Sequence, residues 1–280
     1  MDDLIGHYEI QKIPAIAQIV DDYVTLGRKM KNTVWGMAYI DVTDARKIIH
    51  AHFEKTGERI SFTAFLISCY SRVIEKHKYP MNTFHKRKKY YYTFDDVDVM
   101  TNIEKTLPSG IKKPVNYTIR KANEKTLRQI NDELQAAKQE KPKEVSTHEK
   151  KTLGIIKIFP KLPRFLRRII LRITFNDPLK RKRILGTVGM TAVGMLAKEG
   201  TRGYGHGIFI TPHNLGLAVA GLEKAPMVID DKVVIREVIA ITFAMDHTVI
   251  DGGPATRFGT DFLWMVEHGY KEVDWCFKSL

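Results

Sequence analysis

His247 is the residue of this sequence best suited to chemistry, because an imidazole can take up a proton near neutral pH. A carboxylate, Asp251, follows it by four positions, and Gly252 and Gly253 come directly after. A histidine and an aspartate at this spacing also occur often as a structural pair in a loop. The pair by itself therefore predicts no reaction. The neighbouring sequence is needed to distinguish a catalytic pair from a structural one.

The elements around His247 are predicted to hold it at the end of a strand. The apolar run Val233–Phe243 indicates a strand that ends just before it, and a helix is predicted from about Pro254 to His268. Gly252 and Gly253 predict a tight turn between them, because glycine adopts backbone conformations that other residues avoid. Such a turn exposes a polar side chain while the scaffold holds it rigid.

Further strand and helix patterns follow one another along the chain without a strict βαβ alternation. Strands are predicted at Val34–Val42, Val97–Ile103, Pro114–Arg120, Gly186–Val193, Gly207–Thr211 and Leu215–Leu222, and helices at Ile16–Met30, Thr43–Glu54, Ile60–Lys78, Thr126–Lys138 and Leu162–Phe175. This order favours a mixed-sheet α/β or α+β domain. With 280 residues, 44% of them hydrophobic, we expect residues 1–280 to form a single domain.

Charge and terminal sequence limit the partners and the compartment. The net charge of +13 suggests an anionic partner, such as nucleic acid, a membrane surface or a phosphate-bearing cofactor. The N-terminus lacks a signal-peptide pattern, and no uncharged apolar run reaches the ~20 residues of a membrane-spanning helix. Two isolated cysteines fit a reducing compartment, so we expect a cytoplasmic protein.

Two strings resemble the catalytic domain of the acyltransferases of 2-oxoacid dehydrogenase complexes. FAMDHTVIDGGPATRF, residues 243–258, resembles the signature Asp-His-Arg-Val-Ile-Asp-Gly followed by small residues and Arg-Phe, with Thr248 in place of the usual arginine. Its shorter form, His-x-x-x-Asp-Gly, also marks chloramphenicol acetyltransferases, which share the fold. LGTVGMTAVG, residues 185–194, resembles the family strand Gly-Gly-Thr-Phe-Thr-Ile-Ser-x-Leu-Gly and places Thr191 on the family's hydroxyl residue. Weaker matches in the same order extend the resemblance over about residues 25–140 and 184–268.

The resemblance implies a two-layer, chloramphenicol acetyltransferase-like fold and CoA-dependent acyl transfer. His247 would be the general base on a thiol, and Thr191 would donate a hydrogen bond to the oxyanion. Asp251 would order the loop by pairing with an arginine, for which Arg28 is a candidate, and Gly252 would support the site. CoA phosphates would use part of the positive charge, and no metal is expected. Because the family's site lies between neighbouring subunits of a trimer, we expect a homotrimer or a larger assembly of trimers.

The chain also departs from the family. No lipoyl or subunit-binding domain precedes the catalytic region, so we expect no covalent lipoyl group on this chain and a small or carrier-bound acceptor, such as a thiol. Residues 141–183 have no counterpart that we can place. They fall into a polar loop at about 138–152 and a basic amphipathic insertion at about 153–183.

Several interpretations stay open. The Leu162–Phe175 helix is either a core or trimer-packing helix with a solvated basic face, or a membrane-surface helix. A non-catalytic scaffold that keeps the acyltransferase fold is the alternative to an enzyme, although the presence of both His247 and Thr191 opposes it. Nucleic-acid binding would use the basic and aromatic run Lys86–Tyr92. We favour a solvated hairpin tip for that run.

Overall fold

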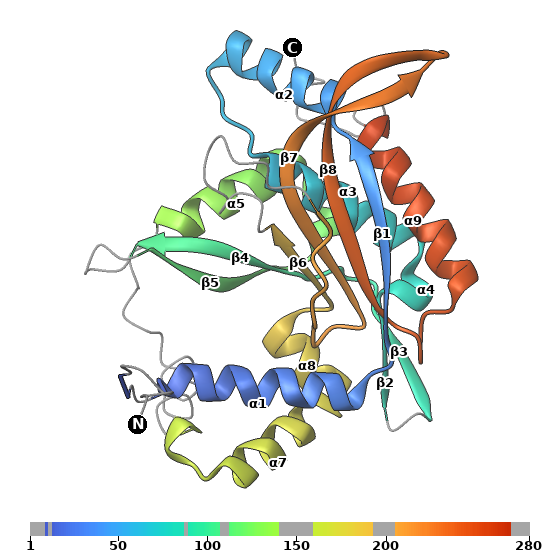
Figure 1. Cartoon of the computed structure of the whole chain (residues 1–280). Helices are drawn as coiled ribbons and strands as arrows, with labels where there is room; N and C mark the ends of the chain where they lie inside the picture. The colour runs from blue at the N-terminus through green and yellow to red at the C-terminus, as the bar shows by residue number, and fades with distance from the viewer. Residues whose placement is uncertain are drawn as a thin grey trace, which may run out of the picture.

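A mixed six-stranded sheet forms the centre of the molecule (Figure 1). The structure is a computed structural model that describes residues 9–10, 13–86, 89–106, 112–139, 159–192 and 205–269. The sheet has the order β1-β8-β7-β6-β4-β5, from β1 (Thr33–Asp41), β4 (Val99–Thr106), β5 (Lys112–Ile119), β6 (Val188–Ala192), β7 (Leu215–Ile229) and β8 (Lys232–Asp246). The inner pairs β4–β6 and β6–β7 are parallel and the outer pairs are antiparallel, which confirms the predicted mixed sheet.

Helices α3 (Phe62–Lys76), α5 (Leu127–Gln139) and α9 (Gly252–Glu267) form the second layer of the fold. Ser61 accepts a hydrogen bond from the Ala64 amide and caps α3. Tyr70 of α3 and Phe243 of β8 are both buried and both meet Phe258 and Phe262 of α9 edge to face. This aromatic cluster joins the sheet to its helices, so the predicted two-layer arrangement of sheet and helices is confirmed.

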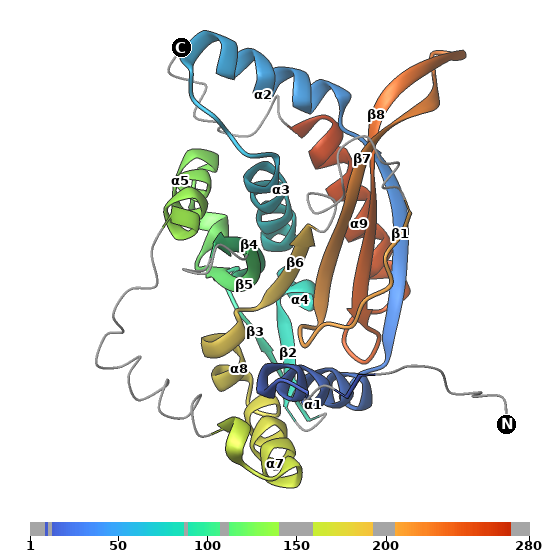
Figure 2. The same ribbon diagram turned by 60° about the vertical axis from the view of Figure 1, so that its left-hand side comes forward.

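The remaining elements lie at the two ends of the sheet (Figures 1 and 2). Helix α4 (Lys78–Met81) leads into the small hairpin β2 (Thr83–Lys86) and β3 (Tyr90–Thr93), which lies at the end of the sheet where β1 begins. Helix α2 (Thr43–Thr56) lies at the end where the β7–β8 hairpin extends. At the opposite end, α1 (Ala15–Met30) runs beside α7 (Arg164–Phe175), and α8 (Pro178–Leu185) leads into β6. None of the described helices combines the length and the apolarity that crossing a bilayer requires.

Helix α7 corrects one prediction. One of the two interpretations of this helix expects a solvated basic face. Arg167 on that face is only 4% exposed, while Phe165 on the apolar face is 63% exposed. Asp22 of α1 is fully buried and accepts hydrogen bonds from Arg164, Arg167 and Arg168, which turns Arg167 inward while Arg164 stays exposed. The apolar face of α7 therefore lies outside the core of this chain, and its basic face is divided between the buried Arg167 and the exposed Arg164 and Arg172.

Smaller differences concern boundaries. The expected strand at Gly207–Thr211 is wrong, because residues 206–211 make no strand pairing. Strands β7 and β8 are longer than predicted and meet at Asp230 and Asp231, whose positive φ angles of 49° and 61° suit a tight hairpin turn. The hairpin predicted around Lys86–Tyr92 is present as β2–β3. The expected polar loop lies outside the described residues from residue 140 onward.

Candidate active site

His247 is the first residue of the turn that follows β8, and its side chain is about half exposed. Its backbone amide donates to the Asn32 carbonyl over 2.9 Å, just before β1. The Asp246 amide donates to the Asn214 carbonyl over 2.8 Å, just before β7. The turn is thus tied to the segments that begin β1 and β7, which confirms that His247 is exposed at the end of a strand.

The Asp246 side chain forms further hydrogen bonds that hold the same turn. Its buried carboxylate accepts from the Thr248 amide at 3.1 Å and from the Asn32 amide at 3.4 Å. The Thr248 hydroxyl accepts from the Asn32 side-chain amide at 3.3 Å. Thr248, the one departure from the family signature, therefore serves as a further link between the His247 turn and β1.

Asp251 stands at the N-terminal end of α9, where the helix dipole favours a negative charge. Its Oδ1 lies 3.6 Å from His247 Nδ1, and both side chains are exposed. No ion pair joins Asp251 to Arg28 among the described residues. Arg28 is exposed on the last turn of α1, four residues before Asn32.

Gly252 and Gly253 do not form the tight turn that we expected. Both belong to the first turn of α9, and neither has a positive φ. A side chain added at Gly252 would meet nothing within 4 Å. The turn itself is made by Val249 and Ile250, whose amides donate to the Asp246 carbonyl.

A cationic cluster supports the segment that leads into β7. The Lys31 ammonium donates to the carbonyls of Thr211 and His213, and Arg181 donates to the Pro212 carbonyl and, over 2.8 Å, to Asn214 Oδ1. Burial lowers the pKa of Lys31 well below its usual value and lowers the pKa of Arg181 to about 10. Burial also lowers the pKa of His213 to about 3, so this histidine is neutral. The cluster positions Asn214 and, through it, the His247 turn.

Thr191 lies near the end of β6 and is partly exposed. Strand β6 begins after Gly186, whose φ is 80° and where an added Cβ would lie 2.7 Å from the Asp98 carbonyl oxygen. Glycine is therefore required there, and it lets the Thr187 amide donate to that carbonyl over 2.9 Å. The Gly-Thr pair thus fixes the start of the strand that carries Thr191.

His247 and Thr191 are not brought together within one chain. Thr191 pairs with Ala218 on β7, and Ala218 pairs with Thr242 on β8, five residues before His247. At ordinary strand spacings the two residues lie roughly 19 Å apart. Any reaction that uses both needs a second copy of the chain.

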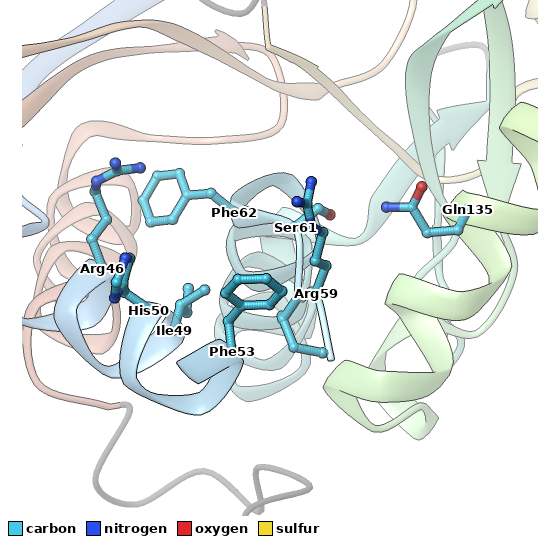
Figure 3. Close-up of a pocket in the computed structure, with 9 residues that line it drawn as sticks. Arg46, Ile49, His50, Phe53, Arg59, Ser61, Phe62 and Gln135 are labelled. Atoms are coloured by element: carbon cyan, nitrogen blue, oxygen red, sulfur yellow. The ribbon is translucent and has the colours of Figure 1, made fainter. Parts of the chain in front are cut away.

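A pocket of about 440 Å³ lies between α2, the start of α3 and α5 (Figure 3). Its cationic groups are Arg46 and Arg59. The Arg59 guanidinium lies over the Phe53 ring at 5.2 Å, and the Arg46 guanidinium lies over the Phe62 ring at 5.8 Å. Arg46 also donates to Glu237 over 2.8 Å. The pocket therefore combines positive charge with flat apolar surfaces.

A second pocket, of about 290 Å³, adjoins the first, because Ser61 and Phe62 line both. It is also lined by Lys138, by Val219 of β7 and by Ala192, the residue after Thr191. The two pockets together lead from Arg59 to the end of β6. No group of three or more His, Cys, Asp or Glu side chains is placed to bind a metal ion within the described ranges.

Several positioning residues escaped the sequence patterns. Lys31, Asn32 and Asn214 carry no motif. Asn32 and Asn214 contact Asp246 from more than 30 residues away in the sequence, and Lys31 contacts His213 from 182 residues away. The pocket residues Arg46 and Arg59 also gave no signal beyond their charge. Only the excess of basic residues indicated that such a site exists.

Comparison with known proteins finds a family match in the C-terminal third of the chain. Residues 186–272, which include Thr191 and His247, match the family described as 2-oxoacid dehydrogenases acyltransferase (catalytic domain). Over 51 residues the chain is 45% identical to the dihydrolipoyllysine-residue acetyltransferase component of the pyruvate dehydrogenase complex of Zymomonas mobilis. That stretch is 18% of this chain and only 12% of the relative.

The fold matches over nearly the whole chain. The cubic core of the pyruvate dehydrogenase multienzyme complex is 16% identical with a TM-score of 0.67, and the match covers 96% of each chain. The dihydrolipoamide acetyltransferase of Azotobacter vinelandii is 16% identical with a TM-score of 0.66 over the same shares. The resemblance is therefore confirmed: residues 186–272 carry the catalytic-domain pattern of the 2-oxoacid dehydrogenase acyltransferases, on the fold of dihydrolipoamide acetyltransferase cores.

Proposed function

We propose that this protein is a CoA-dependent acyltransferase whose active site forms between neighbouring copies of the chain. The observation that carries this proposal is the placement of the family's histidine and hydroxyl positions. His247 is exposed at the end of β8, and Thr191 is partly exposed near the end of β6, next to the second pocket. The family match of residues 186–272 supports an acyltransferase.

His247 is the proposed general base. Asp251 faces Nδ1 of the ring, which leaves Nε2 to take the proton of a thiol, either of CoA or of the second substrate. The thiolate then attacks a thioester carbonyl carbon, and a tetrahedral intermediate forms. When this intermediate collapses, the carbon–sulfur bond of the leaving thiolate breaks and that thiolate takes the proton back from His247.

Thr191 is the proposed oxyanion donor. Its hydroxyl can donate one hydrogen bond to the negative oxygen of the tetrahedral intermediate. In the Azotobacter vinelandii enzyme, a serine, a histidine and an asparagine are the residues studied in the catalytic mechanism, and the asparagine follows the histidine by four positions. Asp251 follows His247 by the same interval, which supports a role for it beside the base.

A homotrimer would join the two residues. One chain would supply His247 and its neighbour Thr191, since the fold keeps them far apart within one chain. The face of edge strand β1 supports such assembly, because Trp35, Met37 and Tyr39 alternate along it and are 40%, 46% and 50% exposed. An exposed apolar face on an edge strand fits contact with another subunit.

The pocket in Figure 3 is the proposed site of the CoA nucleotide. Arg46 and Arg59 would bind phosphate groups, and the Phe53 and Phe62 rings would flank the adenine. From there the pantetheine arm would pass Ser61 and reach the second pocket beside Ala192. This route brings the reactive sulfur toward Thr191.

Replacing Arg59 tests this assignment. We expect Arg59→Gln to weaken CoA binding about tenfold, because a charge-assisted hydrogen bond is worth about 1.5 kcal/mol. The Kd for CoA is measured by titration calorimetry and the KM in an acyl-transfer assay. The matched control is Lys55→Gln, which removes one exposed charge from the same helix region outside the pocket. Equal effects of the two substitutions would argue against the pocket as the CoA site.

A further inference from the structure

The outward face of α7 carries an apolar stripe. It consists of Phe165, Leu166, Ile169, Ile170 and Ile173, spaced so that they share one side of the helix. Phe165 is 63% exposed, Ile169 50% and Ile173 59%. Leu179 and Ile184 of α8 add further exposed apolar surface. A group of large apolar side chains on the outside of a folded domain marks an interaction surface.

Buried ion pairs fix the rotation of α7. Asp22 lies at 0% exposure with Arg167 Nε at 2.8 Å, Arg168 Nε at 3.0 Å and Arg164 Nε at 3.1 Å. On the same inward side, the Phe175 ring meets the Tyr23 ring edge to face at 5.4 Å. Turning the stripe inward would leave the Asp22 carboxylate buried without partners, so the outward stripe is a stable feature of the fold.

The surroundings of the stripe are strongly basic. Residues 159–185 contain nine lysines and arginines and one acidic residue, Asp177, for a net charge of +8. Lys161, Arg172, Lys180 and Arg183 are exposed around the stripe. Asp177 is occupied as the N-cap of α8, where it accepts from two backbone amides. Helix α7 also forms the outer edge of the molecule in both views (Figures 1 and 2).

We propose that α7 docks this protein on an anionic membrane surface. The helix would lie in the plane of the interface, with the apolar stripe at the boundary between headgroups and acyl chains and the exposed basic residues at lipid phosphates. The charge favours lipid over a second copy of the chain, because a symmetric contact would bring two sets of four exposed basic residues together. This surface is separate from the proposed CoA pocket and the His247 turn.

Vesicle flotation tests the proposal. The full chain is mixed with vesicles of phosphatidylcholine alone or of phosphatidylcholine with phosphatidylglycerol. We expect flotation with the anionic vesicles, weakened by salt and reduced about tenfold by the double variant Ile169→Ser/Ile173→Ser. Arg172→Gln and Arg183→Gln should each reduce it roughly fivefold. Val233→Ser/Ile235→Ser is the matched control, because these residues are 73% and 74% exposed on the β7–β8 hairpin.

Three outcomes would overturn the proposal. The wild-type chain could fail to float with anionic vesicles, or the α7 and hairpin variants could float equally well. The third outcome is that the α7 variant changes the oligomeric state measured by light scattering without lipid, which would assign the stripe to contact between copies. Acyl transfer in lipid-free buffer is measured in parallel, so failure of membrane binding is distinguishable from failure of the proposed activity.

Discussion

At the scale of single residues, the site depends on how the His247 side chain is presented rather than on the histidine alone. Backbone hydrogen bonds to Asn32 and Asn214 hold the two ends of the turn, and the buried Asp246 carboxylate binds amides inside it. The imidazole is therefore exposed on a rigid support, as a positioned general base requires. Asp251 adds a carboxylate on the Nδ1 side of the ring.

Removing the imidazole tests the role of His247 directly. We expect His247→Ala to lower kcat for acyl transfer by about 10²–10⁴-fold, because the thiol then loses its general base. CoA binding should change little, since the proposed nucleotide pocket is remote from the turn. Steady-state kinetics with CoA and a thioester measure the first effect, and calorimetry measures the second.

The control for this substitution is His268→Ala. His268 is an exposed histidine just after α9, stacked on Trp264 at 5.8 Å between ring centroids. Its removal changes the number of histidines but not the turn after β8. An unchanged kcat in the His247→Ala enzyme, or an equal loss in both variants, contradicts the assignment of His247 as the base.

At the scale of elements, the insertion before β6 is attached to the fold through charge. Helix α7 binds α1 mainly through the three arginines that converge on Asp22, because its apolar stripe faces outward. Burial alone would raise the pKa of Asp22, but hydrogen bonds from Arg167, Arg164 and Arg168 outweigh it and lower the pKa. The carboxylate is therefore ionised at neutral pH.

Neutralising this carboxylate should destabilise the protein. We expect Asp22→Asn to lower the free energy of unfolding by about 3 kcal/mol, because the buried Arg167 loses its charged partner. Chemical denaturation at neutral pH measures the change. Asp21→Asn is the control, since Asp21 pairs with Arg164 at the exposed surface, where an ion pair contributes about 0–1 kcal/mol. Equal losses in the two variants would contradict the account of the α1–α7 contact.

The buried Asp22 carboxylate also makes the stability of the protein depend on pH. A carboxylate whose pKa is lowered on folding stabilises the protein above its unfolded pKa, near 3.8, and this stabilisation is lost as the pH falls through the lower folded value. The stability difference between wild type and Asp22→Asn should therefore be constant above about pH 5 and shrink below about pH 4. A difference that grows on acidification would contradict this explanation.

The sequence predicted where helices and strands lie along the chain better than which face of each helix is buried. The strand before His247 and helix α9 follow from apolar periodicity, which is a local property, whereas the two-layer arrangement was implied by the family resemblance. The burial of Arg167 on α7 could not be predicted that way, because its partner Asp22 lies more than 140 residues away. The same limit applies to the CoA pocket, which draws Arg59 and Gln135 from different elements.

At the scale of the whole molecule, the separation of His247 and Thr191 is the most consequential feature. Both positions were predicted from their strings, and the sheet register shows that one chain cannot place them at one reacting carbon. A closed trimer solves this, because each chain then contributes one residue to each of two sites. The exposed apolar face of β1 is suited to such an assembly.

Mixed assembly tests this account most directly. His247→Ala and Thr191→Ala chains are each expressed and purified alone, and in a separate preparation the two are co-expressed and purified as one mixed oligomer. A site between two chains receives an intact His247 from one variant and an intact Thr191 from the other in about one case in four, so we expect about a quarter of wild-type acyl-transfer activity from the mixture and almost none from either variant alone. A folded mixed oligomer as inactive as its two parents would contradict the shared site.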